Sequence, residues 1–101
     1  MTTNTHDMLH ENCVSIAKQL EQDSQQQESR IWEDAMDIEF TIDPRRNFIG
    51  ARILIAFGGP NIWVNTRNDT VEGSWGSDRI QIGFDDDNFI HETCEQYFES
   101  L

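Results

Sequence analysis

The sequence predicts an α+β fold in which an antiparallel meander of four or five strands lies between two helical ends. Apolar residues recur at helical spacing in residues 1–36 and again in 85–101, whereas in 37–84 they mostly alternate with polar residues. The 101 residues suffice for one domain, and no apolar run approaches the roughly 20 residues that a membrane span needs. We therefore expect a single domain, 1–101, with both terminal helices packed on one face of the sheet.

The first segment carries a single apolar stripe. Four apolar residues follow the spacing i, i+4, i+7 and i+11, which places them on one side of a helix. They are Leu9, Cys13, Ile16 and Leu20. Residues 21–29 contain no large apolar side chain and are expected to form a loop or an exposed helical turn. A second short helix is expected over about 28–36, because Ile31, Trp32, Ala35 and Met36 then share one face.

The middle of the chain is expected to form the sheet. Ile38, Phe40 and Ile42 alternate with polar residues, which is typical of a half-buried strand. Residues 48–57 are apolar at most positions, as in a central strand. Further strands are expected at 62–65, 70–75 and 80–84, and the turns at 43–47, 58–61, 67–69 and 76–78 are rich in Gly, Pro, Asn and Asp.

Residues 85–101 predict a C-terminal helix. Asp85, Asp86 and Asp87 offer an N-cap and carboxylates for its first turn, where they suit the helix dipole. Its apolar face consists of Phe89, Ile90, Cys94, Tyr97, Phe98 and Leu101. Cys13 and Cys94 thus belong to the core faces of the two helices, and we expect both to be buried, reduced thiols.

The charge is unevenly distributed along the chain. The formal net charge is −12, from 19 acidic and 7 basic residues. Residues 1–43 hold ten acids and two bases, 44–84 hold three acids and five arginines, and 85–101 hold six acids and no base. A protein that binds nucleic acid directly needs a basic surface, so this balance argues against that class. The acidity therefore belongs to the two ends of the chain.

Several patterns that can carry chemistry are incomplete. His6 and His10 have the i, i+4 spacing of metal ligands, but further ligands are not evident. His91 and Cys94 can share a helix face, yet a thiol in an apolar stripe is inert. The glycine-rich 58–61 lacks the lysine of a phosphate-binding loop, and the aspartate run lacks the closing Glu of a calcium loop. We therefore expect no metal, no cofactor and no enzymatic activity.

Tryptophan and arginine residues of the sheet allow two interpretations. Trp63 and Trp75 lie on neighbouring predicted strands and can stack across a hairpin as part of the packing. Alternatively, one face of the sheet is a contact surface, because exposed Trp and Arg anchor interfaces. That face would carry Trp75, Arg52, Arg67 and Arg79.

The last helix carries an acidic stripe, Glu92, Glu95 and Glu99, at i, i+3 and i+7. Like charges at these spacings each destabilise a helix by a few tenths of a kcal/mol. One interpretation is ordinary acidic solubility. The other is that ordered carboxylates imitate a nucleic-acid backbone and occupy a basic groove on a partner. Glu33, Asp34 and the aspartates at 85–87 would extend this candidate contact surface.

Two segments add a resemblance. The stretch from Ala51 to Val64, with Gly58-Gly59-Pro60-Asn61, and the stretch from Val71 to Gly76, with Trp75-Gly76, resemble a family of short proteins carried on phages and conjugative elements. In size, acidity and lack of catalytic motifs the chain is similar to anti-CRISPR and antirestriction proteins, several classes of which mimic DNA.

The resemblance implies a non-enzymatic inhibitor in the host cytoplasm, a monomer or homodimer. Its partner would be a basic nucleic-acid-binding protein or a CRISPR effector complex, whose nucleic-acid site it would block. The alternative is an acidic antitoxin or immunity protein that neutralises a basic toxin.

Overall fold

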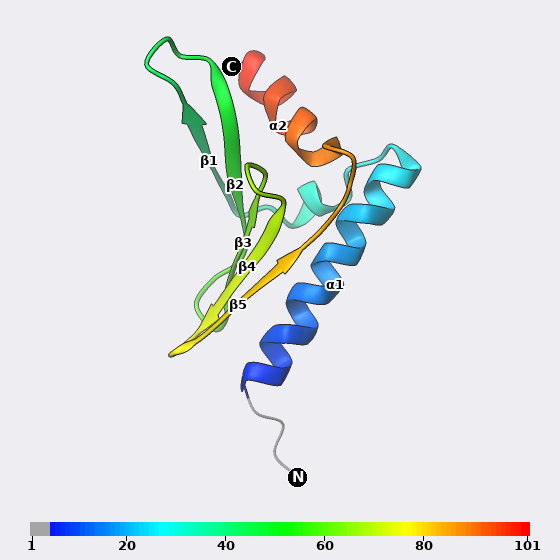
Figure 1. Ribbon diagram of the computed structural model, residues 1–101, viewed down its shortest axis with the longest axis vertical. Coiled ribbons are helices and arrows are strands. Elements are labelled where there is room, and N and C mark those ends of the chain that lie inside the picture. The colour runs from blue at the N-terminus through cyan, green and yellow to red at the C-terminus, as the bar shows by residue number, and fades with distance from the viewer. Residues whose placement is uncertain (1–4) are drawn as a thin grey trace.

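The computed structural model describes residues 5–101. Its elements follow one another in the order α1 (Thr5–Gln26), η1 (Ile31–Asp34), β1 (Asp37–Ile42), β2 (Phe48–Ala56), β3 (Asn61–Asn65), β4 (Thr70–Trp75), β5 (Asp78–Gly83) and α2 (Phe89–Glu99), where η1 is a 3-10 helix (Figure 1). The five strands form one antiparallel sheet in the order β1-β2-β3-β4-β5. The predicted α+β meander is therefore confirmed.

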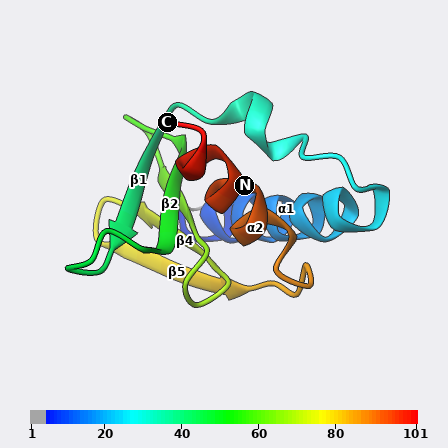
Figure 2. The same cartoon turned by 90° about the horizontal axis from the view of Figure 1, so that it is seen from above.

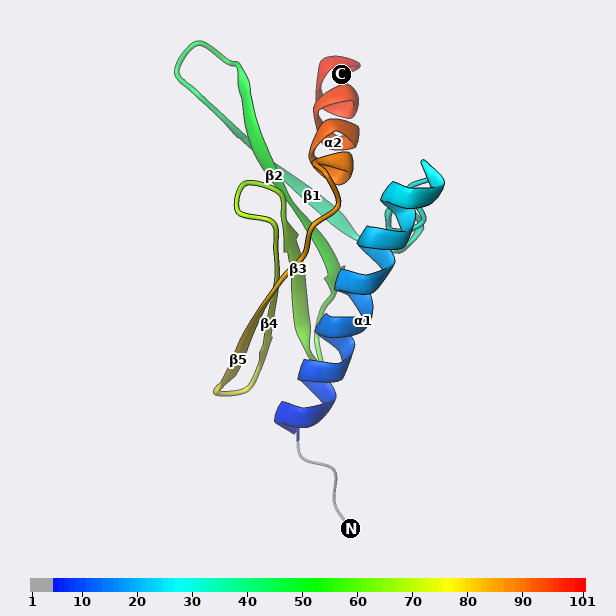
Figure 3. The ribbon, with the colours of Figure 1, turned by 45° about the vertical axis from the view of Figure 1, so that its right-hand side comes forward.

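Both helices lie on one face of the sheet, as predicted. Seen from above in Figure 2, the sheet turns from β1 to β5 around the side that holds α1 and α2. Helix α1 packs on β4 and β5, and α2 packs on β2 (Figure 3). Within the described residues the opposite face is left uncovered by helix. In the same part of the chain, no helix has the length and apolar content to cross a membrane.

The core fills the space between the sheet and the helices. The register aligns Ile53, Val64 and Val71 in one row across the three central strands, and all three are fully buried. Leu9 and Cys13 of α1 pack from the other side. This close approach depends on Gly73 in β4, since a Cβ there would lie 2.6 Å from Cys13 Sγ and 2.8 Å from Leu9 Cδ1.

Helix α1 is longer than its apolar stripe. It continues to Gln26, through residues that the sequence predicts as a loop or an exposed turn. The cause is Asp23, which is buried although acidic. Its Oδ1 accepts a hydrogen bond from Gln19 Nε2 at 2.7 Å, and its Oδ2 accepts one from the Ile31 N–H at 2.9 Å. The last turn is thus held by polar contacts, which hydrophobic periodicity does not detect.

The second helix expected at 28–36 is shorter than predicted. Only the four residues of η1 are helical, and Ile31 is the buried one. Met36 does not share its buried face and is 60% exposed. The Met36 N–H donates to the Leu54 carbonyl, which draws this residue toward the sheet and ends the helical segment.

Aromatic rings fasten α2 to the first two strands. Phe98 lies 5.2 Å from Phe40 and 5.8 Å from Phe48, measured between ring centroids. Tyr97 lies 5.4 Å from Trp32 in an edge-on arrangement. Such pairs add to the stabilisation from burial. We call Trp32, Phe40, Phe48, Tyr97 and Phe98 the aromatic cluster, and it holds the orientation of α2 on the sheet.

The two cysteines are free and fully buried, as predicted. Burial raises the pKa of Cys13, and burial together with the nearby Asp86 carboxyl raises the pKa of Cys94 to about 12. Both side chains are therefore neutral thiols at neutral pH, and they serve as small apolar groups of the core.

Candidate interaction surfaces

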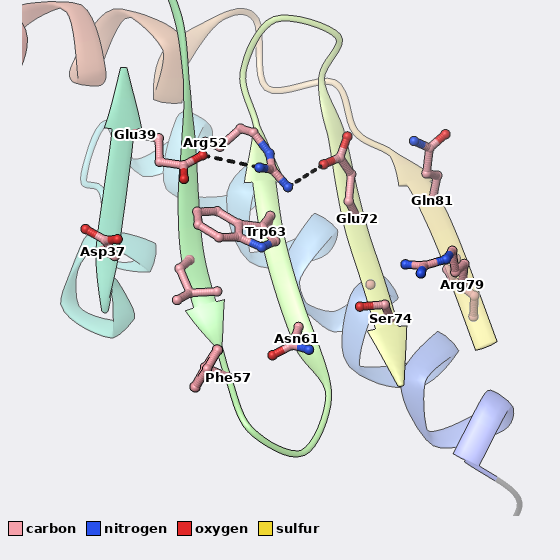
Figure 4. A pocket seen from close by; sticks show the side chains of 13 residues that line it. Asp37, Glu39, Arg52, Phe57, Asn61, Trp63, Glu72, Ser74, Arg79 and Gln81 are labelled. Atoms are coloured by element: carbon pink, nitrogen blue, oxygen red, sulfur yellow. Dashed lines mark hydrogen bonds and ion pairs between the residues drawn. The ribbon is translucent and has the colours of Figure 1, made fainter. Parts of the chain in front are cut away.

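The face of the sheet that points away from the helices carries most of the polar strand residues. Strand alternation places every second side chain there. One row across the five strands consists of Asp37, Leu54, Trp63, Glu72 and Gln81. The rows beside it include Glu39 and Arg52 on one side, and Asn61, Ser74 and Arg79 on the other. We call this surface the open sheet face (Figure 4).

Arg52 organises the centre of the open sheet face. Its Nη1 lies 3.2 Å from Glu39 Oε1, and its Nη2 lies 3.4 Å from Glu72 Oε1. The same guanidinium lies 4.3 Å from the centroid of the Trp63 ring, a cation–π contact. Asn65 Nδ2 donates to the second oxygen of Glu72 at 3.2 Å. The arginine charge is thereby compensated within the chain, and the ring has a defined position (Figure 4).

The open sheet face is hollowed. A hollow of about 1010 Å³ reaches across all five strands from Asp37 to Gln81. Phe57, in the loop after β2, lines one end and is 72% exposed. The side chain of Arg79 lines the β5 side and has no hydrogen-bond or ion-pair partner in the part of the chain that the structure describes. This surface thus offers an aromatic ring, an exposed phenyl group and an unpaired cation.

Trp75 does not belong to the open sheet face. It lies one residue beyond Ser74, so its side chain points to the helix side, where it packs against the core. The predicted Trp63–Trp75 stack is also wrong, because the register pairs Trp63 with Glu72. Of the predicted surface, Arg52 and Arg79 line the hollow, and the tryptophan beside them is Trp63.

Alternation within the strands could have identified this tryptophan. Ile62 and Val64 are apolar neighbours of Trp63 and are buried, so the residue between them points to the other face. Trp75 follows buried Val71 and Gly73 at intervals of two residues, so its side chain lies on the same face of the sheet as theirs. Arg67 follows β3, outside the hollow, and its aliphatic stem packs over Gly50 of β2.

The second candidate surface consists of acidic side chains from the helical segments. Glu92 and Glu99 of α2 are exposed, and Glu95 is half-buried. Exposed carboxylates also lie in η1 and before α2. We call Glu33, Asp34, Asp85, Asp87, Glu92, Glu95 and Glu99 the helix-side carboxylates. Among residues 5–101 none of the seven has an ion-pair partner.

Asp86 is not a surface residue, although the sequence predicts it as one. Its side chain is 2% exposed, and its Oδ2 accepts a hydrogen bond from the Ile90 N–H at 2.9 Å in the first turn of α2. The N-cap residue of α2 is not one of the three aspartates but Asn88, whose side chain makes no capping hydrogen bond. Asp86 caps the first turn from two residues before Asn88, while Asp85 and Asp87 are exposed. Because Asp85, Asp86 and Asp87 are identical neighbours, the sequence alone does not indicate which of the three is buried.

A second carboxyl with a buried oxygen lies near Asp86. Asp69, in the turn before β4, and Asp86 each have a buried Oδ1 without a hydrogen-bond partner among the described residues. Burial raises the pKa of both. The Asp69 carboxyl raises the pKa of Asp86 further, and the Asp85 carboxyl does the same for Asp69, where His91 opposes the shift. The protonated form of these two groups is therefore favoured more than in an exposed aspartate.

His91 and Cys94 do not form a nucleophile–base pair. His91 Nδ1 lies 3.0 Å from the hydroxyl of buried Thr66, which also accepts a hydrogen bond from the Ala51 N–H. Cys94 is a buried thiol with a raised pKa. His6 and His10 are exposed, and residues 5–101 contain no group of three or more His, Cys, Asp or Glu side chains placed to hold a metal ion.

Comparison of the chain with protein-family models, with curated proteins and with solved structures finds no match.

Proposed function

We propose that the protein is a non-enzymatic inhibitor of the anti-CRISPR or antirestriction kind. In this proposal it binds a basic protein or complex that handles nucleic acid, and its helix-side carboxylates occupy the nucleic-acid site of that partner. The observation that carries the proposal is the stripe Glu92, Glu95 and Glu99 on α2, whose carboxylates have no ion-pair partner within residues 5–101.

The spacing of the stripe suits a site built for a phosphate backbone. Carboxylates three and four residues apart on a helix are separated by about 4.5 and 6 Å along its axis. Phosphates along one DNA strand follow at about 3.4 Å of axis. The carboxylates are thus about 1 to 3 Å further apart than the phosphates, a difference that long arginine and lysine side chains can span. Binding then releases counterions from both surfaces and becomes sensitive to salt.

The attachment of α2 supports a preorganised contact. Tyr97 and Phe98, which lie between Glu95 and Glu99, are held by rings of β1, β2 and η1. The carboxylates therefore project from a helix of fixed orientation, and less conformational entropy is lost when a partner binds.

The experiment measures inhibition of DNA binding and cleavage by purified CRISPR effector complexes and restriction enzymes. For a sensitive enzyme, we expect the inhibition constant to rise by at least about tenfold between 50 and 200 mM salt, since several charge contacts are screened. The variant E92Q/E95Q/E99Q should inhibit more weakly. If no such enzyme is inhibited while a basic toxin enzyme is neutralised, the antitoxin interpretation replaces this one.

A further inference from the structure

We propose that the open sheet face is a dimer interface for a second copy of this chain. The two sheets would pack face to face about a two-fold axis that runs parallel to the middle strand, β3. The helices of both copies would then lie on the two outer sides. This inference concerns a different surface from the proposed inhibitor site and does not depend on it.

The centre of the face has the residue types that anchor interfaces. Trp63 stands on β3 and is only half-buried, with Arg52 stacked on it. Trp and Arg dominate the residues whose removal weakens protein interfaces most. Because Trp63 lies on the middle of five strands, an axis along β3 brings the two Trp63 rings together.

The shape of a twisted sheet is compatible with this axis. A sheet with uniform twist is saddle-shaped, and a two-fold rotation about a line along its middle strand turns the saddle into one of matching curvature. The strands of the two copies then remain nearly aligned, as in face-to-face sheet packings about 10 Å apart. The hollow across the five strands leaves room for the two central rings.

The charges on the face are complementary to themselves under the same rotation. The β1 side carries Asp37 and Glu39, and the β5 side carries Arg79 (Figure 4). The axis places β1 of one copy over β5 of the other. Asp37 stands in the row of Gln81, and Arg79 is two residues further along β5, about 7 Å away, which is within the reach of an arginine side chain.

Both groups are available for this pairing. Arg79 is exposed and unpaired among residues 5–101, and the Asp37 carboxylate is exposed and accepts only the N–H of the next residue, Ile38. Each edge of the dimer would thus gain one ion pair that the single chain does not make. Glu39 remains bound to Arg52 and adds to the negative side.

Charge repulsion also favours this face over the helical side. Each copy has a net charge of −12, whereas the hollow of the open sheet face is lined by three acids, Asp37, Glu39 and Glu72, and two bases, Arg52 and Arg79. Face-to-face packing brings the near-neutral strands together and keeps the helices apart. Strands about 4.8 Å apart and about six residues long make a face of roughly 24 by 20 Å. This size is at the low end for specific interfaces, so we expect a reversible dimer.

The experiment exchanges the charges of the two edges. In R79E an acid faces Asp37 at each edge of the dimer, and in D37R an arginine faces Arg79. Each variant alone should therefore raise the dimer dissociation constant by about tenfold or more. An equimolar mixture should recover the dimer, because each edge then joins an acidic to a basic residue. Sedimentation equilibrium over a range of protein concentrations measures both effects.

The controls keep the same charge changes away from the face. R30E and E28R alter exposed residues near η1 and should leave the dissociation constant within about twofold. Thermal unfolding verifies that every variant is folded. W63A should raise the dimer dissociation constant more than either charge variant does.

The proposal is overturned if the purified chain stays monomeric up to millimolar concentration. It is equally overturned if a dimer forms that neither W63A nor the charge variants weaken, or if mixing R79E with D37R recovers no dimer. Each of these outcomes is read from the chain alone, and none of them affects the inhibitor proposal.

Discussion

The open sheet face and the helical side differ in whether their charged side chains form ion pairs. On the open sheet face Arg52 joins Glu39 and Glu72, and its guanidinium also covers Trp63. On the helical side Glu92, Glu95 and Glu99 follow one another, and none of them has an ion-pair partner in the described part of the chain. Internal pairing lowers the cost of charge, whereas an uncompensated stripe costs stability and leaves its full charge for an outside partner. The difference separates a surface suited to self-association from one suited to a basic partner.

A larger residue at position 73 should lower the stability of the fold most, because Gly73 lets α1 pack closely on β4. In G73V the new side chain meets Cys13 Sγ and Leu9 Cδ1 and displaces α1 from β4. We expect the free energy of unfolding to fall by about 3 kcal/mol, as for other overpacked sites. Urea denaturation measures it. G59V is the matched control, because its Cβ meets nothing within 4 Å, and it should change stability by less than about 0.5 kcal/mol.

The next effect concerns the buried cap of α2. D86A leaves the Ile90 N–H without its acceptor and should cost about 1–2 kcal/mol, whereas the exposed neighbour in D85A should cost much less. Thermal or urea unfolding at one pH distinguishes the two. Equal losses would contradict the assignment of the cap to Asp86.

Asp86 also predicts a pH dependence. Its pKa is raised in the folded chain, so the folded state holds the proton more tightly than the unfolded state. The associated stabilisation is complete below the unfolded pKa of about 3.9 and is lost as pH rises through the folded value. D86N cannot titrate, so the stability of the parent should fall relative to D86N as the pH rises above about 4. A constant difference between pH 3 and 8 would contradict the raised pKa.

A smaller effect is expected on the open sheet face. Arg52 and Glu39 are substantially exposed, with side-chain exposures of 39% and 56%, so solvent screens their interaction. R52A should cost about 0.5–1 kcal/mol, and E39Q less than that, in urea unfolding at low salt. The E39Q difference should vanish in about 1 M NaCl, where the Debye length is about 3 Å.

The smallest effect tests the repulsion within α2. Glu99 stands in the last turn, where a carboxylate opposes the helix dipole, and it is four residues from Glu95. E99Q should therefore raise the free energy of unfolding by a few tenths of a kcal/mol. Glu92 stands in the first turn, where the dipole favours it, so E92Q should gain less. A loss of stability in E99Q would contradict this and would indicate that Glu99 makes a stabilising contact.

Periodicity was sufficient to predict the elements that bury apolar side chains. The stripe from Leu9 to Leu20 marks α1, and the alternation around Phe40 marks β1. Turn residues located the reversals: Gly58 has a φ of 97°, and Asp43 accepts the N–H groups of Arg45 and Asn47. These signals are local, since each depends on a few neighbouring residues.

The sites depend on contacts that are distant in sequence. Arg52 meets Glu39 and Glu72 only because three strands bring them into adjacent rows. Asp86 is buried near Asp69, which lies 17 residues away in the sequence, and its chain neighbours Asp85 and Asp87 remain exposed. Trp63 and Trp75 were separable by strand parity, but only with the buried neighbours of each taken into account. Long-range placement is thus what the sequence did not reveal.

The rate of association with an enzyme that the chain inhibits distinguishes a contact made by the α2 stripe from a general effect of charge. E92Q/E99Q removes two exposed carboxylates of α2 and retains half-buried Glu95, while the control E11Q/E28Q removes two exposed carboxylates elsewhere and has the same net charge. Complementary charge acts chiefly on the on-rate. If the stripe makes the contact, the association rate should be about tenfold lower for E92Q/E99Q at low salt and nearly unchanged for E11Q/E28Q. Equal rates for the two variants would contradict a contact made by the α2 stripe.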